Sequence, residues 1–94
     1  MLERHVELAL VRAANAASVA CWKFTSLSMA GVPDRIIIHP TSGRVGFIEV
    51  KRPGGVPTTL QLRMERILKD RNVFHRFAYS PEEAKQAITE FLQT

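Results

Sequence analysis

Cysteine is nearly absent from this chain of 94 residues, in which Cys21 is the only one. A single cysteine excludes an intrachain disulfide and a cysteine-based zinc cluster, so we expect an intracellular protein. Long apolar runs are also missing, because none approaches the roughly 20 residues that a helix needs to span a bilayer. Charges at Glu3, Arg4, Glu7 and Arg12 interrupt the N-terminal segment, which therefore lacks the apolar stretch of a signal peptide.

Repeats, low-complexity tracts and linkers are absent as well, and so is the G-x-S-x-G motif of serine hydrolases. We therefore expect residues 1–94 to form a single domain around one core, and a hydrophobic content of 46% agrees with this. Acidic residues are few, with 9 against 13 lysines and arginines, and the net charge is +4. This balance is compatible with a nucleic-acid partner but does not identify one by itself.

Hydrophobic periodicity and turn residues predict seven elements in the order α-β-β-β-α-β-α. The helices are expected at Leu2–Ala17, at Thr58–Arg71 and from Ser80 onward. The strands are expected at Val19–Thr25, Arg35–His39, Arg44–Lys51 and Val73–Tyr79. The predicted fold class is α/β, with a mixed four-stranded sheet and helices against its faces.

Apolar side chains and capping residues indicate which parts of these elements are buried and where they end. The run Ile36–Ile38 is typical of a strand buried on both faces, and Trp22 and Phe24 are most simply core residues. Asn72 can adopt the left-handed conformation that ends a helix, and Ser80 is a predicted cap followed by proline. The predicted apolar stripe of the second helix consists of Leu60, Met64, Ile67 and Leu68.

Two short motifs carry the chemistry, G-V-P-D at Gly31–Asp34 and E-V-K at Glu49–Lys51. In a hairpin the start of one strand lies beside the end of the next, so Asp34 and Glu49 should be neighbours. Two close carboxylates repel unless a cation lies between them, and oxygen ligands beside a lysine suit Mg²⁺ at a reacting phosphate. An E-x-K pair alone is usually a solvated pair, but the two motifs together predict a metal-dependent nuclease.

Three segments resemble the virus-type replication-repair nuclease (VRR-NUC) domain of the PD-(D/E)xK superfamily: Lys23–Ser26, Gly31–Arg35 and Phe47–Gly55. The resemblance implies a restriction-endonuclease-like fold and a deoxyribonuclease that depends on Mg²⁺ or Mn²⁺. It also implies a homodimer of the Holliday-junction-resolvase kind, because short phage members of the family tend to dimerise. If the chain is phage-encoded, it would act in the cytoplasm of a bacterial host.

The same resemblance implies the site residues. The catalytic set would be Glu7, Asp34, Glu49, Lys51 and Gln61, and the metal would be held by Asp34, Glu49, the backbone carbonyl of Val50, and Glu7 directly or through water. Glu3 is the alternative to Glu7, because the two lie four residues apart on one helix face. Glu7 is favoured because it borders the apolar stripe, whereas Glu3 lies in the first turn and complements the helix dipole. Gln61 also fits the third position of a capping box begun by Thr58.

Charge outside this set favours a polyanionic partner, and the resemblance implies that this partner is DNA. Without Glu7, Asp34, Glu49 and Lys51, the chain keeps 12 basic and 6 acidic residues, a balance of +6. The candidate phosphate contacts nearest the motifs are Lys23, Arg35 and Arg52. We expect a metal-dependent DNA endonuclease that selects branched or junction DNA by structure, since no base-reading element is visible. The alternative is a non-catalytic nucleic-acid-binding module with a nuclease fold.

Overall fold

Seven elements form in the predicted order in the computed structural model, which describes residues 1–94. The boundaries differ from the predicted ones by no more than two residues. The elements are α1 (Glu3–Ala16), β1 (Ala20–Lys23), β2 (Arg35–Ile38), β3 (Val45–Val50), α2 (Thr59–Asp70), β4 (Phe74–Ala78) and α3 (Pro81–Leu92). None of the three helices has the length and apolar content that crossing a bilayer requires.

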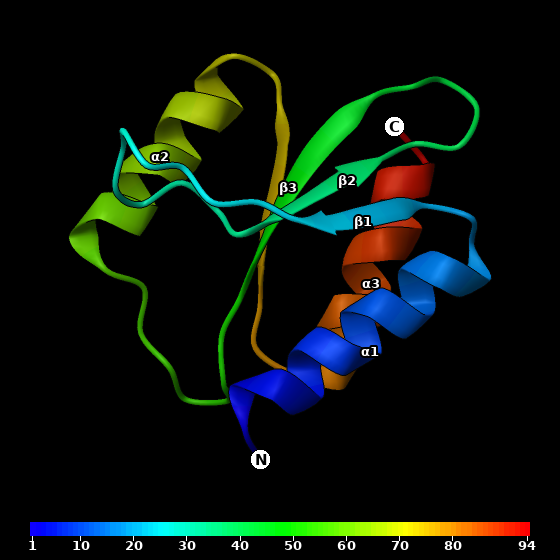
Figure 1. Cartoon of the computed structure of the whole chain (residues 1–94), viewed down its shortest axis with the longest axis horizontal. Coiled ribbons are helices and arrows are strands. Elements are labelled where there is room, and N and C mark those ends of the chain that lie inside the picture. Colours follow the sequence, from blue (N-terminus) through cyan, green and yellow to red (C-terminus); the bar gives the residue numbers. More distant parts are fainter.

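The four strands form one mixed sheet in the order β1-β2-β3-β4 (Figure 1). β1 pairs with β2 and β2 with β3 in antiparallel fashion, whereas β3 and β4 are parallel. The parallel pair requires a crossover between its strands, and α2 supplies it. The predicted α/β fold class and mixed sheet are therefore confirmed.

The main core lies between one face of the sheet and the helices α1 and α3, which pack against each other (Figure 1). Gly46 lets the aromatic rings close over this face, because an added Cβ would lie 2.9 Å from the ring of Phe91 and 3.0 Å from that of Phe74. The fully buried side chains of this core include Val6, Leu10, Ile37, Ile48 and Phe91.

The helix α2 lies on the opposite face, at the β4 edge of the sheet. Successive residues of β4 point to opposite faces of the sheet and therefore contact different helices. The ring of Phe74 packs against Phe91 of α3, with 5.1 Å between centroids, while His75 contacts Glu65 of α2. His75 is buried, and its burial lowers its pKa to about 4, so it is a neutral structural residue.

The caps form where they were predicted. The Thr58 hydroxyl accepts a hydrogen bond from the backbone N–H of Gln61 at the start of α2, and the Ser80 hydroxyl accepts one from Glu83 at the start of α3. Asn72, which follows the C-terminal cap residue Arg71 of α2, has φ of 60°. These local signals explain why the boundaries could be read from the sequence.

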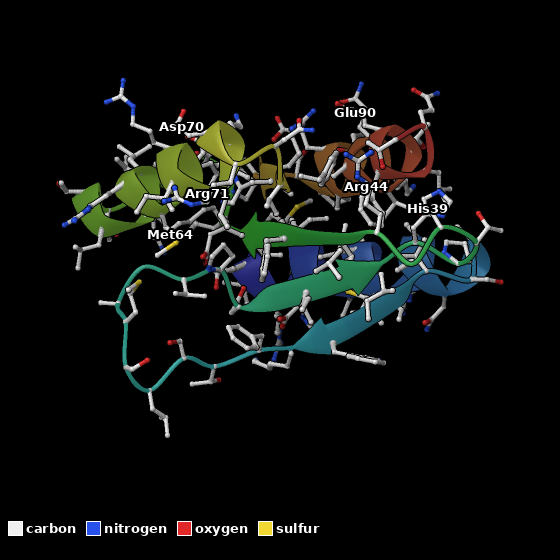
Figure 2. All side chains as sticks on the ribbon, turned by 90° about the horizontal axis from the view of Figure 1, so that it is seen from above. His39, Arg44, Met64, Asp70, Arg71 and Glu90 are labelled. Atoms are coloured by element: carbon white, nitrogen blue, oxygen red, sulfur yellow. The ribbon has the colours of Figure 1, made fainter.

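Burial on the outer face of β1 and β2 differs from prediction. Ile37 is fully buried, but Ile36 and Ile38 on the other face remain partly exposed, so β2 is covered on one face. Trp22 is 60% exposed and Phe24 37% exposed, so neither is a core residue. The reason is that α1 and α3 cover the same face, and Figure 2 shows β1, β2 and β3 in front of α1 with no helix across their near face.

The predicted apolar stripe of α2 is only partly buried, because α2 lies at the edge of the sheet. Met64 is its one buried residue, and Leu60 remains exposed. A helix that touches the sheet only at the edge strand β4 can bury one narrow row of side chains, so the remaining apolar positions face solvent or the loop before β2.

Candidate active site

The hairpin of β2 and β3 brings the two motif carboxylates together. Arg35 pairs with Ile48 in this antiparallel ladder, so Asp34 and Glu49, one residue further along each strand, stand opposite each other. Side chains at directly opposed positions share a face, with Cβ atoms about 4.5–5.5 Å apart. The charge of Asp34 also raises the pKa of Glu49, which agrees with this proximity.

Both carboxyl groups lie in an environment that disfavours their charge. Glu49 is 7% exposed, and burial, followed by the charge of Asp34, raises its pKa to about 7 from an ordinary 4.5. Burial, followed by the charge of Glu7, raises the pKa of Asp34. One carboxylate oxygen of Asp34, Oδ1, is buried without a hydrogen-bond partner. A cation between the two carboxylates would satisfy this oxygen and offset their repulsion.

The donor set fits a hard divalent cation. Asp34 and Glu49 supply carboxylate oxygens, and the carbonyl of Val50 is the next backbone oxygen along β3. No cluster of three His, Cys, Asp or Glu side chains suited to a metal ion is preformed. An oxygen set completed by water is the kind that Mg²⁺ and Mn²⁺ accept, because Mg²⁺ usually keeps several of its waters.

Lys51 follows β3 directly and is held at the same end of the sheet. Its backbone N–H donates to the carbonyl of Ala78 at 2.9 Å, which extends the β3–β4 ladder by one residue. Its positive charge lowers the pKa of Glu49, although burial and Asp34 outweigh this effect. The ammonium group therefore acts electrostatically on the Glu49 carboxylate, from a side chain that is half-buried.

The two glutamates of α1 act on different members of the pair. Glu7 raises the pKa of Asp34, whereas the charge of Glu3 contributes to the raised pKa of Glu49. The Oε2 atom of Glu7 lies 3.1 Å from Arg35 Nη2 and accepts a hydrogen bond from Arg35 Nε at 3.2 Å. Lys23 Nζ is more distant, at 3.8 Å. Glu7 is thus near Asp34 but already has a protein partner.

Comparison with known proteins concerns the fold in which this geometry lies. No protein-family model matches the chain. A curated relative, "Putative nuclease p44" of Acyrthosiphon pisum secondary endosymbiont phage 1, is 39% identical over 61 residues. The match spans 65% of this chain and 64% of the length of that relative. Among solved structures, a "VRR_NUC domain" superposes with a TM-score of 0.84 at 23% identity, covering 95% of this chain and 96% of the other.

The chain has the VRR_NUC fold. The predicted resemblance is thereby confirmed for the fold, and the name of the phage relative agrees with it. Within the VRR_NUC fold, the end of the β2–β3 hairpin is where Asp34, Glu49 and Lys51 meet.

Gln61 stands at the start of α2 in a complete capping box. Its Oε1 accepts a hydrogen bond from the backbone N–H of Thr58 at 2.9 Å, and its own N–H donates to the Thr58 hydroxyl at 3.1 Å. The capping role therefore occupies Oε1 and leaves the side-chain amide hydrogens free to donate. The loop before Asp34 touches this helix start, because a Cβ on Gly31 would lie 2.5 Å from the carbonyl oxygen of Leu60.

Arg35 is the predicted DNA contact that is least accessible in the VRR_NUC fold. Its side chain is 14% exposed, paired with Glu7, and donates to the carbonyl of Cys21 at 3.4 Å. Lys23 and Arg52, the other two candidates, are exposed. Strand alternation indicates only that Arg35 points to the face opposite Asp34, and its pairing with Glu7 depends on where α1 crosses that face.

Proposed function

We propose that this protein is a metal-dependent endonuclease that hydrolyses phosphodiester bonds of DNA. The observation that carries the proposal is the opposed pair Asp34 and Glu49, both of raised pKa, beside Lys51 at the end of one hairpin. The VRR_NUC fold and the phage relative described as a nuclease support it. Two neighbouring carboxylates whose charge is disfavoured, beside a lysine, are the groups expected at a site that binds a divalent cation and a phosphate.

Each site residue has a role that its position allows. Asp34, Glu49 and the Val50 carbonyl would hold Mg²⁺ or Mn²⁺, with Glu7 reaching it through water. Bound there, the ion would polarise the phosphate and lower the pKa of a coordinated water. The Lys51 ammonium would stabilise the charge that develops on the phosphate oxygens. The free amide hydrogens of Gln61 could donate to the phosphate or to the attacking water.

The test is cleavage of labelled duplex and four-way DNA with Mg²⁺, with Mn²⁺ and with EDTA. We expect cleavage with either ion, none with EDTA, and none from Glu49→Gln. Glu82→Gln is the matched control, because Glu82 is an exposed glutamate in the first turn of α3. Cleavage by Glu49→Gln at the wild-type rate would refute the assignment. DNA binding without cleavage under every metal condition would favour the non-catalytic binding module instead.

We further propose that the substrate is branched or junction DNA and that the active species is a homodimer inside a bacterial host. One chain carries a single set of Asp34, Glu49 and Lys51, whereas paired cuts across a four-way junction need two sets related by a two-fold axis. The phage origin of the relative supports the host compartment. Exposed Lys23 and Arg52 are the phosphate contacts that the proposal retains, and Arg35 acts instead through Glu7.

A further inference from the structure

Two aromatic side chains stand uncovered on the outer face of the sheet, one in β1 and one on the residue that follows it. Trp22 is 60% exposed and Phe24 37% exposed, and β1 is an edge strand of the sheet. Figure 2 shows this face of β1, β2 and β3 turned toward the viewer, with α1 behind it. Residues two apart on a strand share a face about 7 Å apart, so the two rings form a short row.

The row leads directly to the candidate active site. The backbone N–H of Phe24 donates to the carbonyl of Asp34 at 2.7 Å, which makes the two residues partners across the β1–β2 ladder. The Phe24 ring is braced edge-on by Phe47, with 6.4 Å between centroids and 66° between planes. Trp22 lies opposite Ile36, one step further from the carboxylates. The first ring is therefore fixed beside Asp34 and the second continues away from it.

Cations lie on the elements around this row. Lys23, between the two aromatic residues, is 66% exposed and reaches toward the opposite face, while Lys51 and Arg52 lie at the end of β3. Rings that stack on bases, next to cations that follow the backbone, are the means by which proteins hold unpaired strands. The charge thus matches a polyanion, and the apolar row matches the faces of its bases.

We propose that Trp22 and Phe24 form a stacking platform for unpaired nucleobases of the DNA strand whose phosphate lies at Asp34 and Glu49. The inference rests on the proposed nuclease function for the position of that phosphate. It specifies the kind of DNA that the site accepts, because a platform beside the carboxylates selects DNA with unpaired bases next to the cleaved bond. Such bases occur at flaps, bulges and opened junction centres, and not in an intact duplex.

A second copy of the chain fits this face less well. Trp22, Phe24 and Val45 are the apolar side chains of this face that are exposed by more than a third, while Ile36, Ile38 and Phe47 are partly covered. Together the three offer on the order of 300 Å², whereas a stable interface buries roughly 800 Å² per partner.

Trp22 is the only tryptophan, so its fluorescence reports on the platform directly. The experiment titrates the protein in EDTA with an oligodeoxythymidylate and with a blunt duplex of equal length. We expect the single strand to quench the emission and the duplex to change it little. Trp22→Ala should weaken single-strand binding about 5- to 100-fold, Trp22→Phe should retain most of it, and duplex affinity should change less than about twofold.

Val45→Ala is the matched control, because it removes an exposed apolar side chain from the same face at the far end of β3. A 2-aminopurine placed in the oligonucleotide reports stacking on the wild-type protein, so the test survives if a variant misfolds. Absence of quenching on both probes, with unchanged affinity for Trp22→Ala and Phe24→Ala, would overturn the platform. A dimer that dissociates in Trp22→Ala without loss of strand binding would overturn it too.

The outcome also separates this proposal from the nuclease assignment. Cleavage of DNA without any quenching refutes the platform alone. Quenching by the single strand with no cleavage under any metal condition refutes the nuclease and leaves a strand-binding face. Glu49→Gln should still show the full quenching, because the rings are unchanged and only the carboxylate is lost.

Discussion

At Glu49, the burial that makes a carboxylate unfavourable would also favour the binding of a cation under the proposed function. Its pKa of about 7 lies above the ordinary 4.5, so the folded state holds the proton more tightly than the unfolded chain does. The associated stability is complete below pH 4.5 and is lost as the pH rises through 7. Without metal at pH 8, the wild type should therefore carry a penalty of up to about 3 kcal/mol.

Glu49→Gln should remove that penalty. We expect the free energy of unfolding in urea with EDTA to rise by about 1–3 kcal/mol at pH 8 and to change little at pH 4. Mg²⁺ should stabilise the wild type and not the variant. Glu82→Gln, at an exposed position, should change stability by at most about 0.5 kcal/mol. If Glu49→Gln destabilises the protein at both pH values, the carboxylate is not strained in the fold.

Lys51→Ala should lower the rate of cleavage far more than it weakens DNA binding. A cation aimed at charge that develops in the transition state typically contributes about 10²–10³ in rate, whereas one surface phosphate contact acts on affinity and on its salt dependence. Single-turnover cleavage and binding measured in parallel separate the two effects. An unchanged single-turnover rate with weakened binding would make Lys51 a binding residue.

Glu7→Gln should reduce stability, because Arg35 is 14% exposed and would lose its charged partner. We expect a loss of about 1–2 kcal/mol in the free energy of unfolding. Glu3→Gln should change it by less than about 0.5 kcal/mol. We also expect Glu7→Gln to impair cleavage strongly and Glu3→Gln to impair it little. A double-mutant cycle with Arg35→Gln measures the pair, and additive effects would show that the two side chains do not interact.

The neighbours of a site residue could be predicted where they follow from the register of the hairpin. They could not be predicted where they depend on elements distant in the sequence. Asp34 and Glu49 meet because two strands joined by a short turn leave no other arrangement. The pairing of Arg35 with Glu7 depends on where α1 crosses the sheet, and the exposure of Trp22 depends on which face the helices leave uncovered. Neither of these is encoded in a local spacing.

At the scale of elements, the loop before β2 is fixed against the start of α2. Gly31 has φ of 84°, and an added Cβ would lie 2.5 Å from the backbone oxygen of Leu60. Gly43, in the turn between β2 and β3, has a similar φ of 73° but nothing within 4 Å of such a Cβ. Both glycines thus adopt a left-handed backbone conformation, but only at Gly31 would an added side chain clash with a neighbouring residue.

Gly31→Ala should therefore cost more stability than Gly43→Ala. Both pay about 1–2 kcal/mol for a left-handed conformation, and only the first must also displace the α2 backbone. Because Gly31 lies three residues before Asp34, we expect its variant alone to reduce cleavage as well. Thermal unfolding and cleavage of the two variants provide the measurement. Equal losses of stability would mean that the backbone at Leu60 can move away from the added methyl group without a measurable loss of stability.

The elements themselves were predictable because their ends carry chemical signals. Thr58, Asn72 and Ser80 each act at the end that their side chain or backbone preference indicates. The run Ile36–Ile38 was misread because β-branched residues favour any strand, whether one face or both faces are covered. Propensity identifies a strand, and only the placement of helices determines how many of its faces are buried.

At the scale of the whole molecule, the junction proposal requires two chains. We expect the protein to sediment as a dimer without DNA, and mixtures of wild-type and Glu49→Gln subunits to nick one strand of a four-way junction without completing paired cuts. Analytical ultracentrifugation and denaturing gels provide the measurements. A monomer at micromolar concentration that cuts single flaps as efficiently as junctions would exclude paired resolution while leaving Asp34, Glu49 and Lys51 as the nuclease site.

Because α1 and α3 pack against each other, the core closes late during synthesis. Leu10 and Ile48 leave the ribosome well before Ala84, Ala87, Ile88 and Phe91, which complete the same cluster from α3. The β2–β3 hairpin is local and can form early, whereas the β3–β4 pair must wait for α2 between its strands. A nascent chain that ends before Pro81 therefore exposes the apolar face of its sheet.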